Sequence, residues 1–330
     1  VYAEKNKNSN FPTNKISTLY KDKKGDIWVG TFGNHGLIRF TPKGFGQEVT
    51  EFDQYIHDAK KPNTIGGVSI SVIYEDSDGI LWVGSKGGGL YKVIRDEFNR
   101  PLKFIGISNQ PYNRNSLSNN SVFSVHEDCM GDIWIGTFGG GLNRIPKEEK
   151  HKSKPKLFRY NTKDGLPSDE IYGILEDENC NLWISTNNGI SKYSIKKNSF
   201  TNLHLSSGLQ DVNFRKNAYF KGGNGLMYFG GINGFNVFYP DGFTDNKYVP
   251  KVEIVDFKVF NKSAQNGEEI LGEVLLEKAI SATKEIVLKN AHNSFSFEFA
   301  ALHYVSPNQN NYAYKLEGFD KDWIVTDSKR

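Results

Sequence analysis

Short runs of alternating hydrophobic and polar residues recur along the first three quarters of the chain, and each run ends in an acidic turn. The runs are Ile16–Asp22, Ile70–Asp76, Val122–Asp128 and Ile171–Asp177. Alternation of this length predicts a half-buried β-strand, and a tight polar turn predicts that an antiparallel partner strand follows. The pattern therefore predicts one strand pair in each unit.

A tryptophan between aliphatic residues follows each acidic turn, and its recurrence reveals an internal repeat. Trp28, Trp82, Trp134 and Trp183 are 54, 52 and 49 residues apart, and each is followed by an aliphatic and a small residue, as in Gly25–Thr31. A degenerate fifth copy has Tyr228 in the tryptophan position, 45 residues after Trp183. The chain thus contains about five related units.

Two further strands complete each unit. A Gly-rich loop and a third short strand follow the tryptophan, and a fourth strand is marked by an aromatic residue. Those aromatics are Phe52, Phe104, Phe158 and Phe200. Four antiparallel strands per unit, with one large aromatic residue to pack against the next unit, are typical of β-propeller blades. We therefore predict an all-β fold of about five four-stranded blades, with the tryptophans as inter-blade core rather than a ligand platform.

The repeat ends before Val252, and a second region begins. Val252–Phe260, Ile286–Leu288 and Phe295–Ala300 alternate without the tryptophan frame, which predicts strands of another kind of sheet. Turn-forming residues near Pro240 and Pro250 mark the change. We expect a propeller domain over 1–248 and the first part of a small β-sandwich over 249–330.

Composition excludes several classes of protein. A formal charge of +3 over 330 residues gives no basic field for nucleic acid, and no apolar window is long enough for a membrane span. The start at Val1 is no signal peptide, so we expect any targeting segment to lie upstream or to have been removed. We expect the two cysteines, Cys129 and Cys180, to be free residues in turns, with a bridge between neighbouring units as the alternative.

The repeated motif resembles the two-component regulator propeller repeat. The resemblance lies in the apolar run, the Asp-x-x-Gly turn, the Trp-Ile/Val-Gly-Thr strand, the Gly-Gly-Leu exit and the strand entries at Phe11–Asn14 and Leu166–Asp169. The Tyr-rich tail Asn311–Trp323 is similar to the start of the immunoglobulin-like domain that follows such propellers. The chain is thus identified as similar to the sensor region of a Bacteroides-type hybrid two-component system.

The resemblance implies a function. Members of that family sense oligosaccharides released from complex glycans, act as periplasmic parts of inner-membrane receptors, and switch on polysaccharide-utilisation genes. It implies an oligosaccharide ligand, no cofactor, no catalytic residue, and a homodimer in the full-length receptor. The chain lacks the family's membrane helix, kinase, receiver and DNA-binding segments and has fewer repeats, so we expect a truncated part of such a receptor.

The loops between the second and third strands and those entering the first strand should emerge on one propeller face, which we take as the candidate binding surface. Amide and guanidinium donors together with aromatic faces suit sugars, whose rings have polar edges and apolar C–H faces. The candidate ligand-binding residues are Phe32, His35, Lys86, Arg114, Asn115, Phe138, Asn187, Asn188 and Arg215, with Asn34, Asn120 and Asn233 on the same face. The alternative is that the Asn and Gly residues serve turn geometry alone.

Two other functions remain open at this point. A propeller lyase or glycosidase would need a non-repeated cluster of carboxylates or of His and Tyr, which the sequence does not reveal. Asp22, Asp76, Asp128 and Asp177 recur at one position and therefore predict turns. Asp76–Gly79 resembles a calcium loop only faintly, and we predict no metal site; His126 occupies a packing position. A protein-interaction scaffold is the third possibility.

Overall fold

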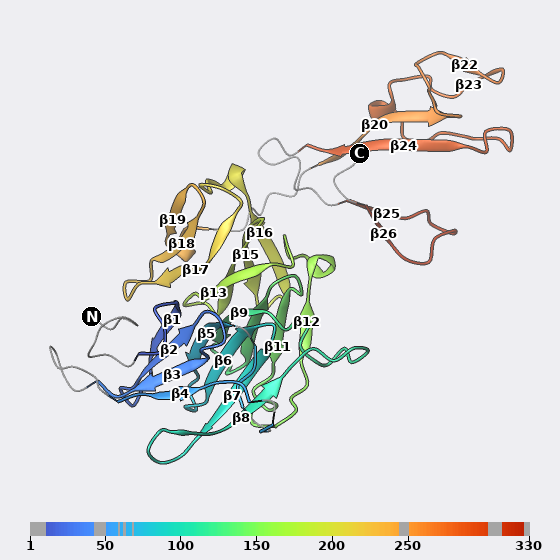
Figure 1. Ribbon diagram of the computed structural model, residues 1–330. Coiled ribbons are helices and arrows are strands. Elements are labelled where there is room, and N and C mark those ends of the chain that lie inside the picture. Colours follow the sequence, from blue (N-terminus) through green and yellow to red (C-terminus); the bar gives the residue numbers. More distant parts are fainter. Residues whose placement is uncertain are drawn as a thin grey trace. The chain divides into compact units, whose positions relative to one another are not determined.

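The computed structural model describes residues 11–42, 51–58, 60–61, 64–67, 69–243, 251–302 and 312–326. The chain divides into two compact units, Val1–Phe243 and Thr244–Arg330 (Figure 1). The expected boundary between 248 and 249 lies outside the described residues. None of the helices in the described part of the chain has the length and apolar character that a membrane crossing requires.

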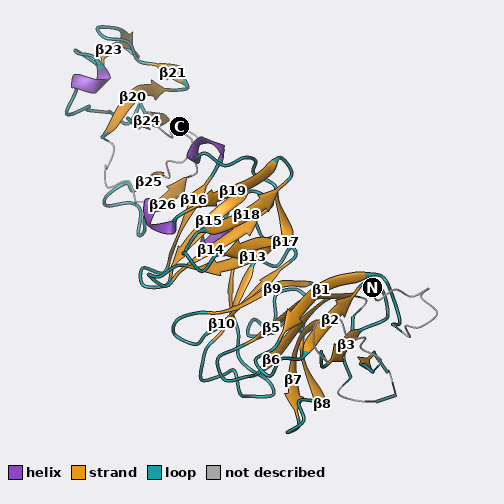
Figure 2. Cartoon of the chain, turned by 90° about the vertical axis from the view of Figure 1, so that its left-hand side faces the viewer, coloured by secondary structure: helices purple, strands orange, loops and turns teal. Residues whose placement is uncertain are grey.

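The first unit consists of antiparallel sheets arranged as successive propeller blades, as predicted (Figures 1 and 2). Four sheets have four strands each, in the chain order of a blade. The first sheet contains β1 (Ile16–Lys21), β2 (Ile27–Thr31), β3 (Leu37–Phe40) and β4 (Asp53–Tyr55). The second sheet contains β5 (Ser69–Glu75), β6 (Leu81–Lys86), β7 (Gly89–Arg95) and β8 (Pro101–Ile107). The third sheet contains β9 (Val122–Glu127), β10 (Ile133–Thr137), β11 (Leu142–Ile145) and β12 (Phe158–Tyr160). The fourth sheet contains β13 (Ile171–Glu176), β14 (Asn181–Thr186), β15 (Gly189–Ser194) and β16 (Ser199–Leu203).

The fifth sheet differs from the predicted four-stranded unit. In the described part of the chain it has three strands, β17 (Phe214–Lys221), β18 (Met227–Gly231) and β19 (Gly234–Phe238). The short 3-10 helices of this unit are η1 (Thr162–Asp164), η2 (Leu205–Ser207) and η3 (Pro240–Gly242). The first strand of each sheet contacts the first strand of the next, from β1 through β5, β9 and β13 to β17. These inner strands therefore surround the propeller axis.

The recurrent aspartate has the turn role predicted for it and a second role that the sequence did not reveal. In the first blade one oxygen of Asp22 accepts the backbone N–H of Asp26 at 2.9 Å, and the other accepts the indole N–H of Trp28 at 2.7 Å. The same indole bond has lengths of 2.9, 2.6 and 2.9 Å in the next three blades. One buried carboxylate thus closes the turn and satisfies the only polar atom of the buried tryptophan side chain.

The tryptophans form inter-blade core, as predicted. All four are 0% exposed, and each packs with residues of the following blade. The glycine two residues after Trp82 permits this approach, because a Cβ on Gly84 would lie 2.6 Å from Val72 and 2.7 Å from Val122 of the next blade. The small residue in the repeated frame is therefore a requirement of blade packing.

A buried lysine also joins neighbouring blades through ion pairs. Lys150, from the loop before β12, is buried, and its ammonium lies 2.7 Å from Asp78 and 2.9 Å from Glu127. A lysine therefore neutralises the Asp76–Gly79 turn that resembled a calcium loop.

His126 packs near the Tyr74 ring, with centroids 6.1 Å apart, which fits the packing role predicted for it.

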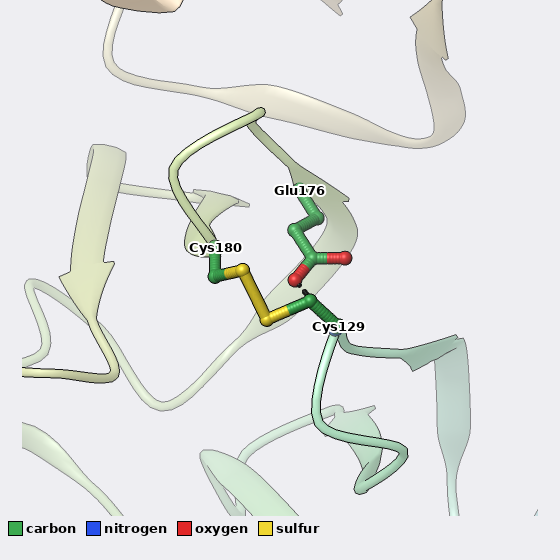
Figure 3. Close-up of side chains that lie close together, drawn as sticks. All are labelled: Cys129, Glu176 and Cys180. Carbon is green, nitrogen blue, oxygen red and sulfur yellow. Dashed lines mark hydrogen bonds between the residues drawn. A yellow bond between two sulfur atoms is a disulfide. The ribbon is translucent and has the colours of Figure 1, made fainter.

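The expectation of free cysteines was wrong. Cys129 and Cys180 form a disulfide with a Cα–Cα distance of 5.9 Å, and the backbone N–H of Cys129 donates to Glu176 at 2.7 Å (Figure 3). Both cysteines lie in the turn between the first and second strands of adjacent blades. Packing of Trp134 against the fourth blade brings these two turns together. Because the sulfur atoms are bonded to each other, this group of side chains offers no thiolate to a metal.

The second unit is also built mainly of strands. Its largest sheet has the order β21–β20–β24, and two ribbons, β22–β23 and β25–β26, accompany it. The elements are β20 (Val252–Val259), β21 (Lys262–Ser263), β22 (Glu269–Ile270), β23 (Glu273–Val274), η4 (Ile280–Ala282), β24 (Phe295–Ala301), β25 (Tyr312–Tyr314) and β26 (Ile324–Thr326).

Two of the three strands predicted for this unit are confirmed. Ile286–Leu288 is not a strand, because this segment joins no ladder with a neighbouring strand; Ile286 and Leu288 instead pack against the buried cluster around Phe257. The alternation of the segment reflects side-chain burial alone. The likeness to an immunoglobulin-like domain stays a prediction, and its tail motif begins at Asn311, outside the described residues.

Candidate functional site: a cluster at the propeller axis

The residue four positions after the repeated aromatic of each blade ends the second strand or directly follows it. The equivalent residues of the five blades are Phe32, Lys86, Phe138, Asn187 and Ile232. Phe32 and Phe138 are 39% and 44% exposed although their neighbours Thr31 and Thr137 are buried. Their backbones form isolated bridges with Ser69 and Glu170, which precede or begin the first strand of the following blade. Two large aromatic side chains are thus presented to solvent from fixed backbone positions.

A β-bulge near the start of each inner strand supplies a second set of side chains. In the first four blades the bulge inserts one residue into the ladder with the second strand, and that residue is Ser17, Ser71, Phe123 or Tyr172. In β17 the register passes from Phe214–Gly231 to Tyr219–Phe229, which leaves three extra residues in the inner strand. A bulge re-aims side chains away from the regular pleat. The fifth blade therefore presents a longer irregular segment, with Arg215 and Lys216, than any other.

The two sets meet around Phe123. The Phe123 ring lies 5.4 Å from the Phe138 ring and 6.3 Å from the Tyr172 ring, measured between centroids. The Lys216 ammonium lies 5.2 Å from the ring centroids of both Phe32 and Phe123. These are cation–π distances. Blades one, three, four and five thus contribute side chains to one cluster.

The surroundings of the cluster shift the pKa values of Lys216 and Tyr172 in opposite directions. Desolvation lowers the pKa of Lys216, and the charge of Lys86 in the second blade lowers it further. The Tyr172 hydroxyl donates to Glu170 at 2.8 Å, and desolvation together with this bond raises the pKa of Tyr172 to about 12. The positive charge of Arg215 acts on Tyr172 in the opposite direction. We define the axial cluster as Phe32, Lys86, Phe123, Phe138, Glu170, Tyr172, Arg215 and Lys216.

Asn217 connects the fifth blade to the first beside this cluster. Its side-chain amide donates to the Ser17 carbonyl at 3.3 Å, and its backbone has a φ of +59°. Asparagine tolerates this left-handed conformation better than most residues. The long bulge of β17 is therefore held between the first and fifth blades.

The structure brings together only some of the predicted ligand-binding residues. Phe32, Lys86, Phe138 and Arg215 belong to the axial cluster, and Asn187 occupies the equivalent repeat position in the fourth blade. Asn188 instead donates to the Pro167 carbonyl at 3.0 Å, and the carbonyl of His35 accepts from Gln54 of the outermost strand β4 at 3.0 Å. These last two residues stabilise loops.

Arg114 and Asn115 lie elsewhere, in the loop between β8 and β9. The carbonyl of Asn115 accepts the backbone N–H of Leu157 at 2.9 Å. Asn115 also lines a pocket of about 220 Å³ together with Lys154 and Lys156. The other amides named on this face have structural partners or another site: Asn120 accepts from Asn109, Asn233 donates to Asp211, and Asn34 lines a separate pocket of about 440 Å³.

Sequence analysis missed Phe123, Glu170, Tyr172 and Lys216. A signal was present for three of them. Phe123 and Tyr172 stand where the first two repeats have Ser17 and Ser71, and Lys216 lies in the segment of β17 that exceeds the repeat. Departures from the repeat, rather than its shared residues, mark the cluster.

The repeat and the overall structure both have known counterparts. The family model of the two-component regulator propeller matches residues 10–33, 64–87 and 165–188. Histidine kinase P4 of Formosa agariphila is 28% identical over 369 aligned positions, which cover 99% of this chain and 26% of that protein. The chain therefore spans about a quarter of the length of this curated relative.

Two solved structures are similar over almost the whole chain. The extracellular domain of the hybrid two-component system BT3049 from B. thetaiotaomicron has a TM-score of 0.64 and 27% identity, covering 95% of this chain and 39% of that one. The extracellular domain of BT4673 from the same organism has a TM-score of 0.54 and 20% identity, covering 96% and 52%, and shows the fold alone. The resemblance predicted from the repeat is thus confirmed: the chain carries two-component regulator propeller repeats and is similar to the extracellular sensor region of a hybrid two-component system.

Proposed function

We propose that the chain is the ligand-sensing region of a hybrid two-component receptor and that it binds an oligosaccharide from a complex glycan at the axial cluster. The relatives support a sensor-region role, because they are a histidine kinase and the extracellular domain of a hybrid two-component system. The observation that carries the ligand proposal is the cluster itself: aromatic rings and cations from five blades gather beside two exposed phenylalanines.

This mixture of groups suits a saccharide. The apolar C–H face of a sugar ring packs on an aromatic face, while Arg, Lys and Tyr donors can bond to hydroxyl oxygens at the ring edge. Phe32 and Phe138 offer exposed rings, and the side chains of Lys86, Arg215 and Lys216 are exposed beside them. Binding at this position contacts several blades at once.

The same geometry favours binding over catalysis. A glycosidase of the usual kind needs two carboxyl groups on opposite sides of the scissile bond. Among the described members of the cluster one carboxylate occurs, Glu170, and it accepts the Tyr172 hydroxyl. A lyase that used Tyr172 as its base would need a pKa near the working pH, whereas burial raises the pKa of Tyr172 to about 12. We therefore propose a non-enzymatic role for this region.

The Cys129–Cys180 disulfide supports an oxidising compartment, since such bonds persist outside the cytoplasm. We propose a periplasmic location and, in the full receptor, a homodimer anchored in the inner membrane that controls polysaccharide-utilisation genes. Ligand binding produces a signal only if the ligand prefers one arrangement of domains or protomers over another. A coupling free energy of about 1–3 kcal/mol is sufficient for a useful response.

The proposal is tested by thermal unfolding of the purified chain against a panel of oligosaccharides from plant and host glycans. A ligand present at about 100 times its Kd adds about 2.7 kcal/mol to stability, which corresponds to an increase of several degrees in Tm. We expect one class of oligosaccharide to raise Tm without being converted to product. Product formation would favour the enzyme alternative, and a folded protein that responds to no glycan would favour the scaffold.

A matched pair of variants locates the binding site. Phe138→Ala removes a 44% exposed ring of the axial cluster, and Phe158→Ala removes a 51% exposed ring from the outermost strand of the same blade. We expect Phe138→Ala to abolish the ligand-induced increase in Tm and Phe158→Ala to retain it. Equal increases in both variants would place the ligand elsewhere.

A further inference from the structure

The three cations of the axial cluster form no ion pair with any acidic residue that the structure describes. Within the part of the chain that the structure describes, neither Lys86, Arg215 nor Lys216 has a carboxylate within ion-pair distance, and Glu170 bonds to Tyr172 instead. Two arginines with largely buried side chains elsewhere in the propeller differ. Arg39 and Arg95 each pair with two carboxylates. Counted with the Glu170 carboxylate, the described members of the axial cluster therefore carry an excess of positive charge in a chain that is otherwise nearly neutral.

We propose that the axial cluster binds an acidic saccharide, one that carries a carboxylate or a sulfate ester, with its anionic group on Lys86, Arg215 and Lys216. The sugar ring then packs on Phe32 and Phe138. This inference rests on the proposed sensor function and specifies the chemistry of its ligand. A neutral sugar would leave the excess positive charge of the described cluster without a counterion.

The position of Lys216 supports the assignment. Its ammonium lies 5.2 Å from two ring centroids, so part of its hydration shell is replaced by aromatic carbon. Lys86 adds like-charge repulsion, and both effects lower the pKa of Lys216. An anion placed between the two ammonium groups relieves the repulsion and restores the lost electrostatic solvation. Arg215 adds a planar guanidinium, which binds a carboxylate or sulfate through two parallel hydrogen bonds.

The origin of these groups in the chain points to a specific site rather than to a property of the repeat. Arg215 and Lys216 lie in the bulge of β17 that has three extra residues, whereas the equivalent bulges of the other blades have one. Lys86 replaces the phenylalanine found at Phe32 and Phe138. Three departures from the repeat thus converge on one locus.

The test compares oligosaccharides of the same backbone and length in which the anionic group is present or has been neutralised or removed. Binding to the purified chain is measured by calorimetry with an oligogalacturonate and its methyl ester, and with a sulfated oligosaccharide and its desulfated form, each of the same length. We expect at least one acidic member to bind at least tenfold more tightly than its neutral partner, and its affinity to fall several-fold as NaCl rises from 50 to 500 mM. Comparison of the two acidic members separates carboxylate from sulfate recognition.

Variants connect the charge preference to the cluster. Lys216→Ala should weaken acidic binding by about tenfold or more, which is the loss expected for one charge-assisted hydrogen bond. Lys103→Ala, on the exposed outer strand β8, is the matched control and should bind normally. Unchanged Tm values in both variants exclude a folding defect.

The outcomes separate this inference from the function on which it rests. Equal binding of neutral and acidic partners, or acidic binding unaffected by Lys216→Ala, overturns the acidic-ligand inference and leaves the sensor function standing. Failure of every saccharide to bind overturns both.

Discussion

At the residue scale, the stability of the propeller depends on a pair that recurs in every complete blade: a buried aspartate and a buried tryptophan six positions later. The carboxylate accepts turn amides with one oxygen and the indole N–H with the other. Local turn formation and inter-blade packing are thereby coupled through one side chain. This explains why the aspartate is found in every blade that has the tryptophan. Its role is structural and does not depend on the loops of the candidate binding face.

Trp134→Phe tests this coupling. The substitution keeps an aromatic ring in the core but leaves an oxygen of Asp128, a 5% exposed residue, without its 2.6 Å indole donor. Loss of a hydrogen bond to a buried charged group costs about 1–3 kcal/mol, so we expect the urea midpoint to fall accordingly. In a double-mutant cycle, Asp128→Asn should cost less in the Trp134→Phe background than in the wild type. Additive effects would contradict the coupling.

Asp177 makes the same interaction measurable through pH. Desolvation alone would raise the pKa of Asp177, but hydrogen bonds from Trp183, Asn181 and Asn179 lower it below its ordinary value of 3.8. A carboxyl group with a depressed folded-state pKa contributes stability above the unfolded pKa and loses it as pH falls through the folded pKa. We expect Asp177→Asn to be less stable than the wild type at pH 7, with the gap in Tm narrowing below about pH 4. A gap that stays constant down to pH 3 would disagree.

At the scale of elements, the blades are joined in several different ways. Aromatic packing and the close approach at Gly84 hold inner strands together, whereas Lys150 joins loops and turns of adjacent blades through ion pairs. The Cys129–Cys180 bond adds a covalent link between the third and fourth blades. The Lys150 ion pairs and the disulfide act at the turns that precede the tryptophans, whereas the close approach at Gly84 lies after Trp82 in the second strand.

Removal of the disulfide should destabilise the chain without changing its fold. The bond closes a loop with a sequence separation of 51, and a disulfide that closes a loop of this size contributes about 2–4 kcal/mol, mainly by restricting the unfolded chain. We expect Cys129→Ala/Cys180→Ala to lower Tm by several degrees and to keep the far-ultraviolet spectrum. Reductant should lower the wild-type Tm toward that of the variant and leave the variant unchanged. A reductant effect on the variant would point to another cause.

At the scale of the whole molecule, burial is uneven along the propeller. The tryptophans of the first four blades are 0% exposed, whereas Tyr228, at the equivalent position of the fifth blade, is half-buried. On the same sheet Phe220 and Phe235 are 64% and 67% exposed. Local stability follows buried contact, so the fifth blade should open more readily than its neighbours. That blade also supplies Arg215 and Lys216, which allows a ligand at the axis to order it.

Amide hydrogen exchange measures this difference in local stability between the fifth blade and its neighbours. In the described part of the chain β19 pairs with β18 alone, whereas β15, the third strand of the fourth blade, pairs on both sides. We expect β19 to exchange much faster than β15 and the inner strand β9 to be among the best protected. Addition of a ligand that binds the axial cluster should slow exchange in β17. Equal protection of β15 and β19 would contradict the lower local stability expected for the fifth blade.

The sequence by itself determined the repeated architecture of this protein. Strand positions, turns and the burial of Trp28, Trp82, Trp134 and Trp183 follow from local alternation and spacing, which depend on residues close together in the chain. The same reasoning predicted nine ligand-binding residues on one face, of which Phe32, Lys86, Phe138 and Arg215 belong to the axial cluster while Arg114 and Asn115 lie elsewhere. It correctly assigned Asp76 and its equivalents to turns.

Only the tertiary structure decided which of those residues meet. Phe123, Lys216 and Phe32 are separated by about 90 residues or more along the chain and converge because inner strands from different blades surround one axis. The Cys129–Cys180 bond and the ion pairs of Lys150 have the same origin. Contacts of this kind depend on the stacking of whole blades and on the size of one bulge, neither of which is encoded in the local alternation of the chain.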